Sequence, residues 1–100
     1  MKTYDIFLDR LPHIDLHGYD RESAKVAVND FILESSILNH KEVVIIHGIG
    51  KGIVKQSVHT TLSKNKKVLS YKLDNFNNGC TIVKIDSKGS NKNDNEIRNR

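Results

Sequence analysis

Apolar residues recur along this chain with two different periods, and the two periods alternate. Residues 13–18 alternate apolar and polar side chains, which predicts a short strand that ends at a glycine. Residues 20–39 carry apolar side chains at helical spacing, with Asp20 as the predicted N-cap. The predicted core stripe of this helix comprises Ala24, Ala27, Val28, Phe31 and Leu38, widened by Val26, Leu33 and Ile37.

The second half of the chain repeats the alternation. A run of β-branched residues favours a buried strand over residues 42–47, and a second helix is predicted over residues 52–64. Residues 68–74 alternate like an edge strand, and residues 81–85 are predicted to return beside them as a hairpin. The predicted inward-facing residues are Val54, Val58, Thr61 and Leu62 on the helix and Leu69, Tyr71 and Leu73 on the edge strand.

Strand, helix and strand in this order form a β-α-β unit, whose two strands are expected to be parallel. Parallel strands end at the same edge of a sheet, where ligands of open α/β folds gather. His17 and His47 are therefore predicted to emerge side by side, each followed by a glycine and the start of a helix. The loop over residues 75–79 lies at the same edge if the strand over residues 68–74 runs parallel to these two.

Composition and charge narrow the function classes. The formal net charge is +4 and the sequence pI is about 9.3, which favours a polyanionic partner such as DNA or RNA. Six lysines and no acid lie between Lys51 and Lys72. A charge run is usually a solvated helix face, but its position next to the glycine-rich turn favours a phosphate-facing patch here. Cys80 is the only cysteine, which predicts a reducing, cytoplasmic location. No signal peptide or membrane-spanning run is evident, and no membrane partner is expected.

The turn His47-Gly48-Ile49-Gly50-Lys51-Gly52 is the candidate phosphate site, because glycines admit close approach and a helix N-terminus attracts anions. A plain tight turn is the alternative. It is not a Walker loop, since Gly52 follows the lysine where Ser or Thr is required. The predicted phosphate- or nucleic-acid-binding residues are Gly48, Gly50, Lys51, Gly52, Lys55 and Phe76. Phe76 either stacks on a base or folds back as a loop anchor.

The candidate catalytic residues are Asp15, His17 and His47. Histidine titrates near neutral pH and suits proton transfer during phosphodiester cleavage. Asp15 either fixes the tautomer of a nearby histidine or holds a cation. If Asp15 and His17 diverge as strand neighbours usually do, Asp15 orients His47 instead. The lack of converging carboxylates argues against a two-metal site, so no metal ligands are assigned and Mg²⁺ is an optional cofactor. His40 and His59 are expected in a loop and on a helix surface.

Three segments resemble the small MutS-related, or Smr, domain family. They are Asp15-Leu16-His17-Gly18, His47-Gly48-Ile49-Gly50 and Gly79-Cys80-Thr81-Ile82-Val83. The chain looks like a stand-alone member, similar to the C-terminal domain of the MutS2 branch. The domain is expected over residues 13–86, with an N-terminal arm over 1–12 and a flexible polar tail over 87–100.

The resemblance implies an α/β (α+β) two-layer sandwich, with a mixed four-stranded sheet in the order 1-2-4-3 and two helices on one face. It also implies nucleic-acid binding and, in several branches, endonuclease cleavage of DNA or RNA. A non-catalytic module that docks on nucleic acid or the ribosome is the alternative. The oligomeric state is open.

Overall fold

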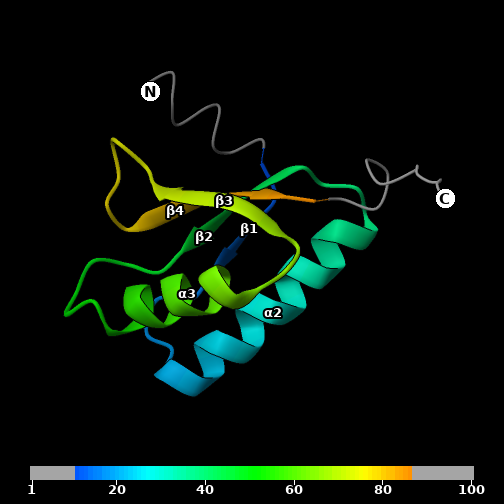
Figure 1. Cartoon of the computed structure of the whole chain (residues 1–100). Coiled ribbons are helices and arrows are strands. Elements are labelled where there is room, and N and C mark those ends of the chain that lie inside the picture. The colour runs from blue at the N-terminus through cyan, green and yellow to red at the C-terminus, as the bar shows by residue number, and fades with distance from the viewer. Residues whose placement is uncertain (1–10, 87–100) are drawn as a thin grey trace, which may run out of the picture.

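The computed structural model describes residues 11–86, which form one mixed β-sheet covered on one face by two helices (Figure 1). The elements, in chain order, are β1 (His13–Asp15), α2 (Arg21–Ile37), β2 (Glu42–Ile46), α3 (Ile53–Lys64), β3 (Val68–Leu73) and β4 (Cys80–Ile85). This confirms the predicted βαβαββ two-layer sandwich. The first strand is shorter than predicted, because the chain leaves the extended conformation after Asp15.

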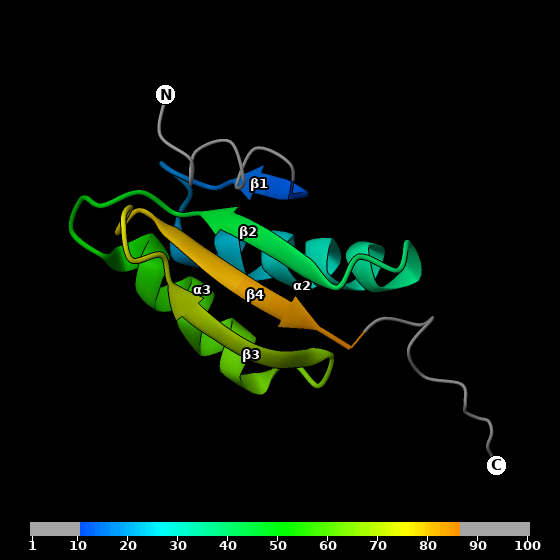
Figure 2. The same ribbon diagram turned by 90° about the horizontal axis from the view of Figure 1, so that it is seen from above.

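The strand order is β1-β2-β4-β3, as predicted. β1 and β2 are parallel, while β4 is antiparallel to both β2 and β3. Figure 2 shows β4 between β2 and β3, with β3 at the edge of the sheet. The carboxyl ends of β1, β2 and β3 therefore share one edge of the sheet.

The core lies between the sheet and the helices. β2 contributes Val43 and Ile45, both fully buried, and β4 contributes Val83 and Ile85 from the same face. These pack against Val28 and other buried residues of α2 and α3. Alternation on each strand thus sends every second side chain to the helices.

The predicted stripe of α2 was partly wrong. The residues that face the sheet are Ala24, Val28, Ile32, Ser35 and Ser36. The small serines fill the last inward positions, and the Ser36 hydroxyl donates to the Asp86 carbonyl at 3.2 Å. The apolar stripe is thus rotated, and four predicted core residues are instead largely exposed: Val26, Leu33, Ile37 and Leu38.

Leu69 on β3 was also predicted to face the core, and it is 66% exposed. The register shifts between Val68 and Ser70, which face Ile85 and Lys84 of β4. One extra residue is therefore accommodated at Leu69, as in a β-bulge, and its side chain leaves the inward series. Tyr71 keeps the predicted contact with the core.

The predicted N-terminal arm, apart from residues 11 and 12, and the predicted polar tail lie outside the described residues. Between residues 11 and 86, neither helix is both long and apolar enough to cross a membrane.

Candidate functional site

The first turn after β1 brings Asp15 and His17 together. The backbone N–H of His17 donates to Asp15 Oδ1 at 3.1 Å, and the His17 ring Nδ1 lies 2.7 Å from the same oxygen. The open question of which histidine Asp15 orients is thereby answered: it is His17. A continued strand would send the two side chains to opposite faces, and this contact forms because β1 ends at Asp15.

The Asp15–His17 contact fixes the protonation pattern of the ring. An ionised carboxylate only accepts hydrogen bonds, so His17 Nδ1 carries a hydrogen, and in the neutral ring the lone pair is then on Nε2. The hydrogen bonds from the His17 side chain and backbone lower the pKa of Asp15, which favours the ionised carboxylate. The His17 side chain is 74% exposed, and its Nε2 is available to a substrate.

His47 lies at the same edge of the sheet but faces the helices. Val43, Ile45 and His47 occupy alternate positions, so the ring continues the inward series of β2 and is only 4% exposed. His17 and His47 thus reach the same edge, as predicted, but the His47 ring turns into the protein instead of emerging beside His17. The His47 ring Nδ1 lies 2.9 Å from the Gly48 carbonyl, and Nε2 lies 2.8 Å from the Thr81 hydroxyl.

A second histidine joins His47 through Thr81. His59 Nε2 lies 2.8 Å from the Thr81 hydroxyl, and the His59 ring stands nearly perpendicular to the His47 ring at a centroid distance of 5.8 Å. One arrangement satisfies all three contacts. His59 Nε2–H donates to Thr81, Thr81 donates to His47 Nε2, and His47 Nδ1–H donates to the Gly48 carbonyl. We call this chain the histidine relay.

Burial keeps the histidine relay neutral. Desolvation lowers the pKa of His47 and of His59, and the positive charge of Lys55 lowers both further. The expected place of His59 on the helix surface was wrong, because the ring is half-buried and also packs on Tyr71. The signal was present in the sequence, since His59 directly follows the inward-facing Val58.

The glycine-rich turn adopts a backbone that only glycine favours. Gly48, Gly50 and Gly52 have φ values of 82°, 30° and 83°. At Gly48, a Cβ atom would also lie 3.3 Å from the Cβ of His17. Gly48 therefore allows the two turns at this edge to touch, which places His17 against the glycine loop.

The N-termini of the two helices differ in their caps. The Asp20 carboxylate accepts a hydrogen bond from the backbone N–H of Ser23 at 2.7 Å, which occupies the start of α2 as predicted. The start of α3 has Gly52 at the cap position and no side-chain cap. Its backbone N–H groups and partial positive charge are thus the ones offered to an anion.

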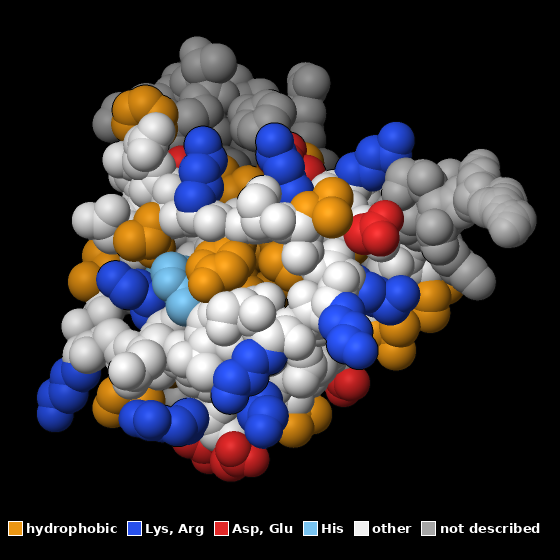
Figure 3. Space-filling model, viewed as in Figure 1, with side chains coloured by type: hydrophobic (Ala, Val, Ile, Leu, Met, Phe, Trp, Pro, Cys, Tyr) orange, Lys and Arg blue, Asp and Glu red, His pale blue; other side chains and the backbone are white. Residues whose placement is uncertain are grey.

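A groove of about 670 Å³ runs between the two turns. Its lining includes all four residues Gly48, Gly50, Lys51 and Gly52, together with Lys55. His17 and His47 also line it, as does Tyr19. Lys and Arg side chains gather around α3 in Figure 3, which agrees with the predicted charge asymmetry. The groove thus combines an exposed histidine with cations and an uncapped helix start, and we call it the histidine groove.

The β3–β4 loop closes the same edge. The Gly79 carbonyl accepts from the backbone N–H groups of His47 at 2.9 Å and Gly48 at 3.0 Å. Its predicted location at the histidine edge is therefore confirmed. Phe76 on this loop is 69% exposed and does not line the histidine groove, so its role in stacking on a base stays a prediction.

Within residues 11–86, no group of three or more His, Cys, Asp or Glu side chains is arranged to hold a metal ion. Mg²⁺ is commonly held by one or two carboxylates together with substrate phosphates. The carboxylate that lines the histidine groove is Asp20, whereas Asp15 does not line it, and Mg²⁺ as an optional cofactor stays a prediction.

Comparisons with known proteins point to one family. The profile of the Smr domain matches residues 14–86. The protein named Endonuclease MutS2 of Clostridium acetobutylicum is 38% identical over 72 residues, and that of Halothermothrix orenii is 35% identical over 74 residues. These alignments cover 72% and 74% of this chain, but the matched region is only 9% of the length of each relative.

Two solved structures have the same fold. The Smr domain of Thermus thermophilus MutS2 gives a TM-score of 0.72 at 24% identity, covering 75% of this chain and 98% of that domain. YdaL, a stand-alone small MutS-related protein from Escherichia coli, gives 0.70 at 23% identity, covering 78% and 72%. At this identity the likeness concerns the fold.

Proposed function

Since this chain belongs to the Smr domain family, we propose that it binds nucleic acid and cleaves phosphodiester bonds, with His17 as the catalytic base. One observation carries the proposal. His17 Nδ1 is held by Asp15 at 2.7 Å, and His17 lines a groove that also offers an uncapped helix start. Together these place an imidazole held by a carboxylate beside an anion site.

In the proposed reaction, the scissile phosphate lies against the turn over residues 48–52. The start of α3, with Lys51 and Lys55, stabilises the negative charge that develops on the phosphoryl oxygens. His17 Nε2 takes a proton from the nucleophile, which is water or, in RNA, the adjacent 2′-hydroxyl. As the new P–O bond forms, the bond to the leaving oxygen breaks, and that oxygen takes a proton from solvent in the open groove.

The buried ring of His47 suits a positioning role better than the proton transfer predicted for it. Both of its nitrogens are engaged inside the protein, and burial disfavours the charged form. Its Nδ1–H instead fixes the carbonyl of Gly48 and hence the direction of the turn that follows. Asp15 acts in the same way on His17, by holding the tautomer whose Nε2 accepts a proton.

A second candidate function is non-catalytic docking on structured nucleic acid or the ribosome. Apolar side chains around the glycine turn favour it, since Ile49 is 70% exposed and Ile53 is 46% exposed. Such side chains are not needed for proton transfer, but they suit stacking or packing against a large partner.

The test compares the wild type with His17→Asn on end-labelled single- and double-stranded DNA and RNA. We expect cleavage to fall by about 10²-fold or more, while oligonucleotide affinity stays within about threefold, because the base is lost and the cations remain. Asp15→Asn is expected to give an intermediate loss. The matched control is His13→Asn, which replaces another exposed histidine at the opposite end of β1 and leaves cleavage unchanged.

Two outcomes contradict the proposal. Equal cleavage by His17→Asn removes that residue from the reaction. An uncleaved substrate with salt-sensitive binding by the wild type favours the docking module. Repeating the assay with chelator, and with a 2′-deoxy nucleotide at the cleaved position, separates a metal-assisted reaction from one that uses the ribose hydroxyl.

A further inference from the structure

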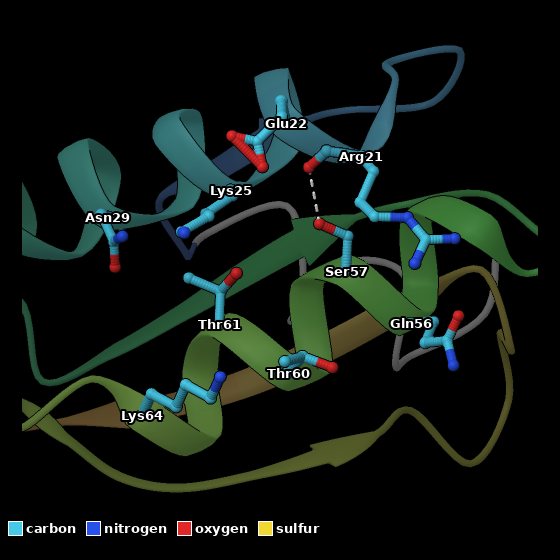
Figure 4. A pocket seen from close by; sticks show the side chains of 9 residues that line it. All are labelled: Arg21, Glu22, Lys25, Asn29, Gln56, Ser57, Thr60, Thr61 and Lys64. Atoms are coloured by element: carbon cyan, nitrogen blue, oxygen red, sulfur yellow. Dashed lines mark hydrogen bonds between the residues drawn. The ribbon is translucent and has the colours of Figure 1, made fainter.

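A second hollow lies outside the histidine groove, between α2 and α3. It has a volume of about 300 Å³, and polar or charged side chains from both helices line it (Figure 4). The apolar core beneath it is already closed, so the hollow is not a packing defect of that core. We call it the interhelical groove.

Hydrogen bonds between the helices fix both ends of the interhelical groove. At one end the Ser57 hydroxyl donates to the Arg21 carbonyl at 2.8 Å, as Figure 4 shows. At the other end the Asn65 side chain donates to the Asn29 side chain at 2.9 Å. Ser57 and Thr61 are each only 7% exposed and form a buried polar floor. The groove is therefore present before any ligand arrives.

The walls carry polar groups at regular intervals. Arg21, Lys25 and Asn29 are four residues apart on α2, and Gln56, Thr60 and Lys64 have the same spacing on α3. Four residues correspond to about 6 Å along a helix axis. Each wall thus offers a donor roughly every 6 Å, which suits a ligand with repeated acceptors rather than a single small anion.

The charge of the interhelical groove is positive. Three cations, Arg21, Lys25 and Lys64, face one carboxylate, Glu22. Arg and Lys are the side chains that contact phosphate oxygens most often. The hydroxyl and amide groups between them can meet sugar and base edges without demanding a particular sequence.

Arg21 connects the two hollows, because it lines both the interhelical groove and the histidine groove. Figure 4 shows its side chain crossing from α2 toward Gln56, near the start of α3. A chain that leaves the glycine turn therefore meets Arg21 first and then Lys25 and Lys64 further along the groove.

We propose that the interhelical groove binds the sugar–phosphate backbone of a single nucleic-acid strand that extends from the histidine groove. This inference rests on the proposed function, in that it extends the path of the same strand. A hollow of about 300 Å³ accommodates one strand, whereas a double helix needs a far wider surface. Its phosphates contact Arg21, Lys25 and Lys64 as successive partners.

The test measures affinity for single-stranded oligonucleotides of increasing length. The variant Lys25→Gln/Lys64→Gln removes two cations from the interhelical groove. The control Lys72→Gln/Lys84→Gln makes the same charge change at exposed positions of β3 and β4. Their neighbours Tyr71 and Val83 pack at the core, so the two lysines project from the other face of the sheet. All measurements use the full chain with His17→Asn, so that cleavage does not interfere.

For the longest strands we expect Lys25→Gln/Lys64→Gln to lose roughly tenfold in affinity. The slope of log affinity against log salt should flatten by about 1.4, because each single-strand phosphate contact contributes about 0.7. Trinucleotides, which fit the histidine groove alone, should bind both lysine variants within about twofold. Glu22→Gln should strengthen the binding of long strands, a gain that a purely structural role for the groove does not predict.

The possible failures are distinct. Equal affinities of the two lysine variants for long strands overturn this inference and leave the proposed function standing. Undiminished cleavage by His17→Asn overturns the catalytic proposal, but the length dependence still reports on the interhelical groove. A third result would also overturn the inference: inorganic phosphate or a mononucleotide binds tightly, Lys25→Gln/Lys64→Gln abolishes this binding, and longer strands bind no more tightly. The ligand of the groove would then be a small anion and not a strand.

Discussion

The histidine relay makes a sharp prediction about Thr81. Thr81→Val replaces the hydroxyl with a methyl group of nearly the same size and removes the oxygen atom that both His47 and His59 contact. Thr81 is fully buried, so water cannot easily take the place of the hydroxyl. The substitution therefore tests the relay without opening a cavity.

The expected loss of stability follows from the hydrogen bond that each imidazole ring loses. His47 is 4% exposed, and an unpaired buried acceptor costs about 1–3 kcal/mol. His59 is half-buried and can find water, so its loss is closer to about 1 kcal/mol. Removing the desolvated hydroxyl itself offsets part of this. We expect Thr81→Val to lower the free energy of unfolding by about 2–3 kcal/mol.

Urea unfolding followed by far-ultraviolet circular dichroism measures this loss. Thr81→Ser keeps the hydroxyl and removes one methyl group, at a cost of about 1 kcal/mol. The control Thr60→Val is the same Thr-to-Val change at an exposed position of α3. Its free energy of unfolding should stay within about 0.5 kcal/mol of the wild-type value. If Thr81→Val is as stable as Thr81→Ser, or more stable, the hydroxyl does not stabilise the fold and the relay reasoning is refuted.

Three further predictions concern pH, a helix cap and a glycine. His47 and His59 have folded pKa values below the ordinary value of 6.5, so unfolding takes up protons as the pH falls below that value. The free energy of unfolding should therefore be highest above pH 6.5 and decrease as the pH is lowered toward the folded pKa values. Urea unfolding between pH 7.5 and 5.5 measures this decrease, and His59→Gln should make it smaller. Asp20→Ala should cost about 1 kcal/mol through loss of the N-cap, read from the same unfolding curves. Gly48→Ala should lower the free energy of unfolding by about 1–2 kcal/mol, because φ is 82° and the new Cβ would lie against His17. It should also reduce cleavage more than oligonucleotide affinity, and equal losses in the two would contradict this.

The sequence predicted the fold well because each element carried its own signal. The β-branched run in β2 and the alternation in β3 fixed the types of these two strands, and the resemblance supplied the strand order. Errors arose where tertiary contacts override local pattern. Ser35 and Ser36 sit inside although the periodicity pointed to larger neighbours, and a bulge at Leu69 changes the inward series by one residue.

The candidate site was predicted as a set of residues but not as a geometry. The edge shared by His17 and His47 followed from parallel pairing alone. The contact between Asp15 and His17 depends on where β1 stops, which a period of two does not reveal. Conversely, the inward direction of His47 could be read from Val43 and Ile45, and His59 could then be recognised as a neighbour on α3.

The double hydrogen bond to the Gly79 carbonyl has a consequence for how this domain tolerates change. Surface hairpin loops usually accept insertions, yet this loop is hydrogen-bonded through Gly79 to the backbone N–H groups of His47 and Gly48. An insertion within residues 75–78 that keeps Gly79 would retain these two hydrogen bonds and enlarge only the tip of the loop. A Cβ atom at Gly79 would instead lie 3.2 Å from the Asn77 side-chain oxygen, which accepts from the Gly79 N–H, so a substitution there crowds the turn itself. Variation in this hairpin thus offers a way to graft new recognition segments beside the histidines without redesigning the sheet.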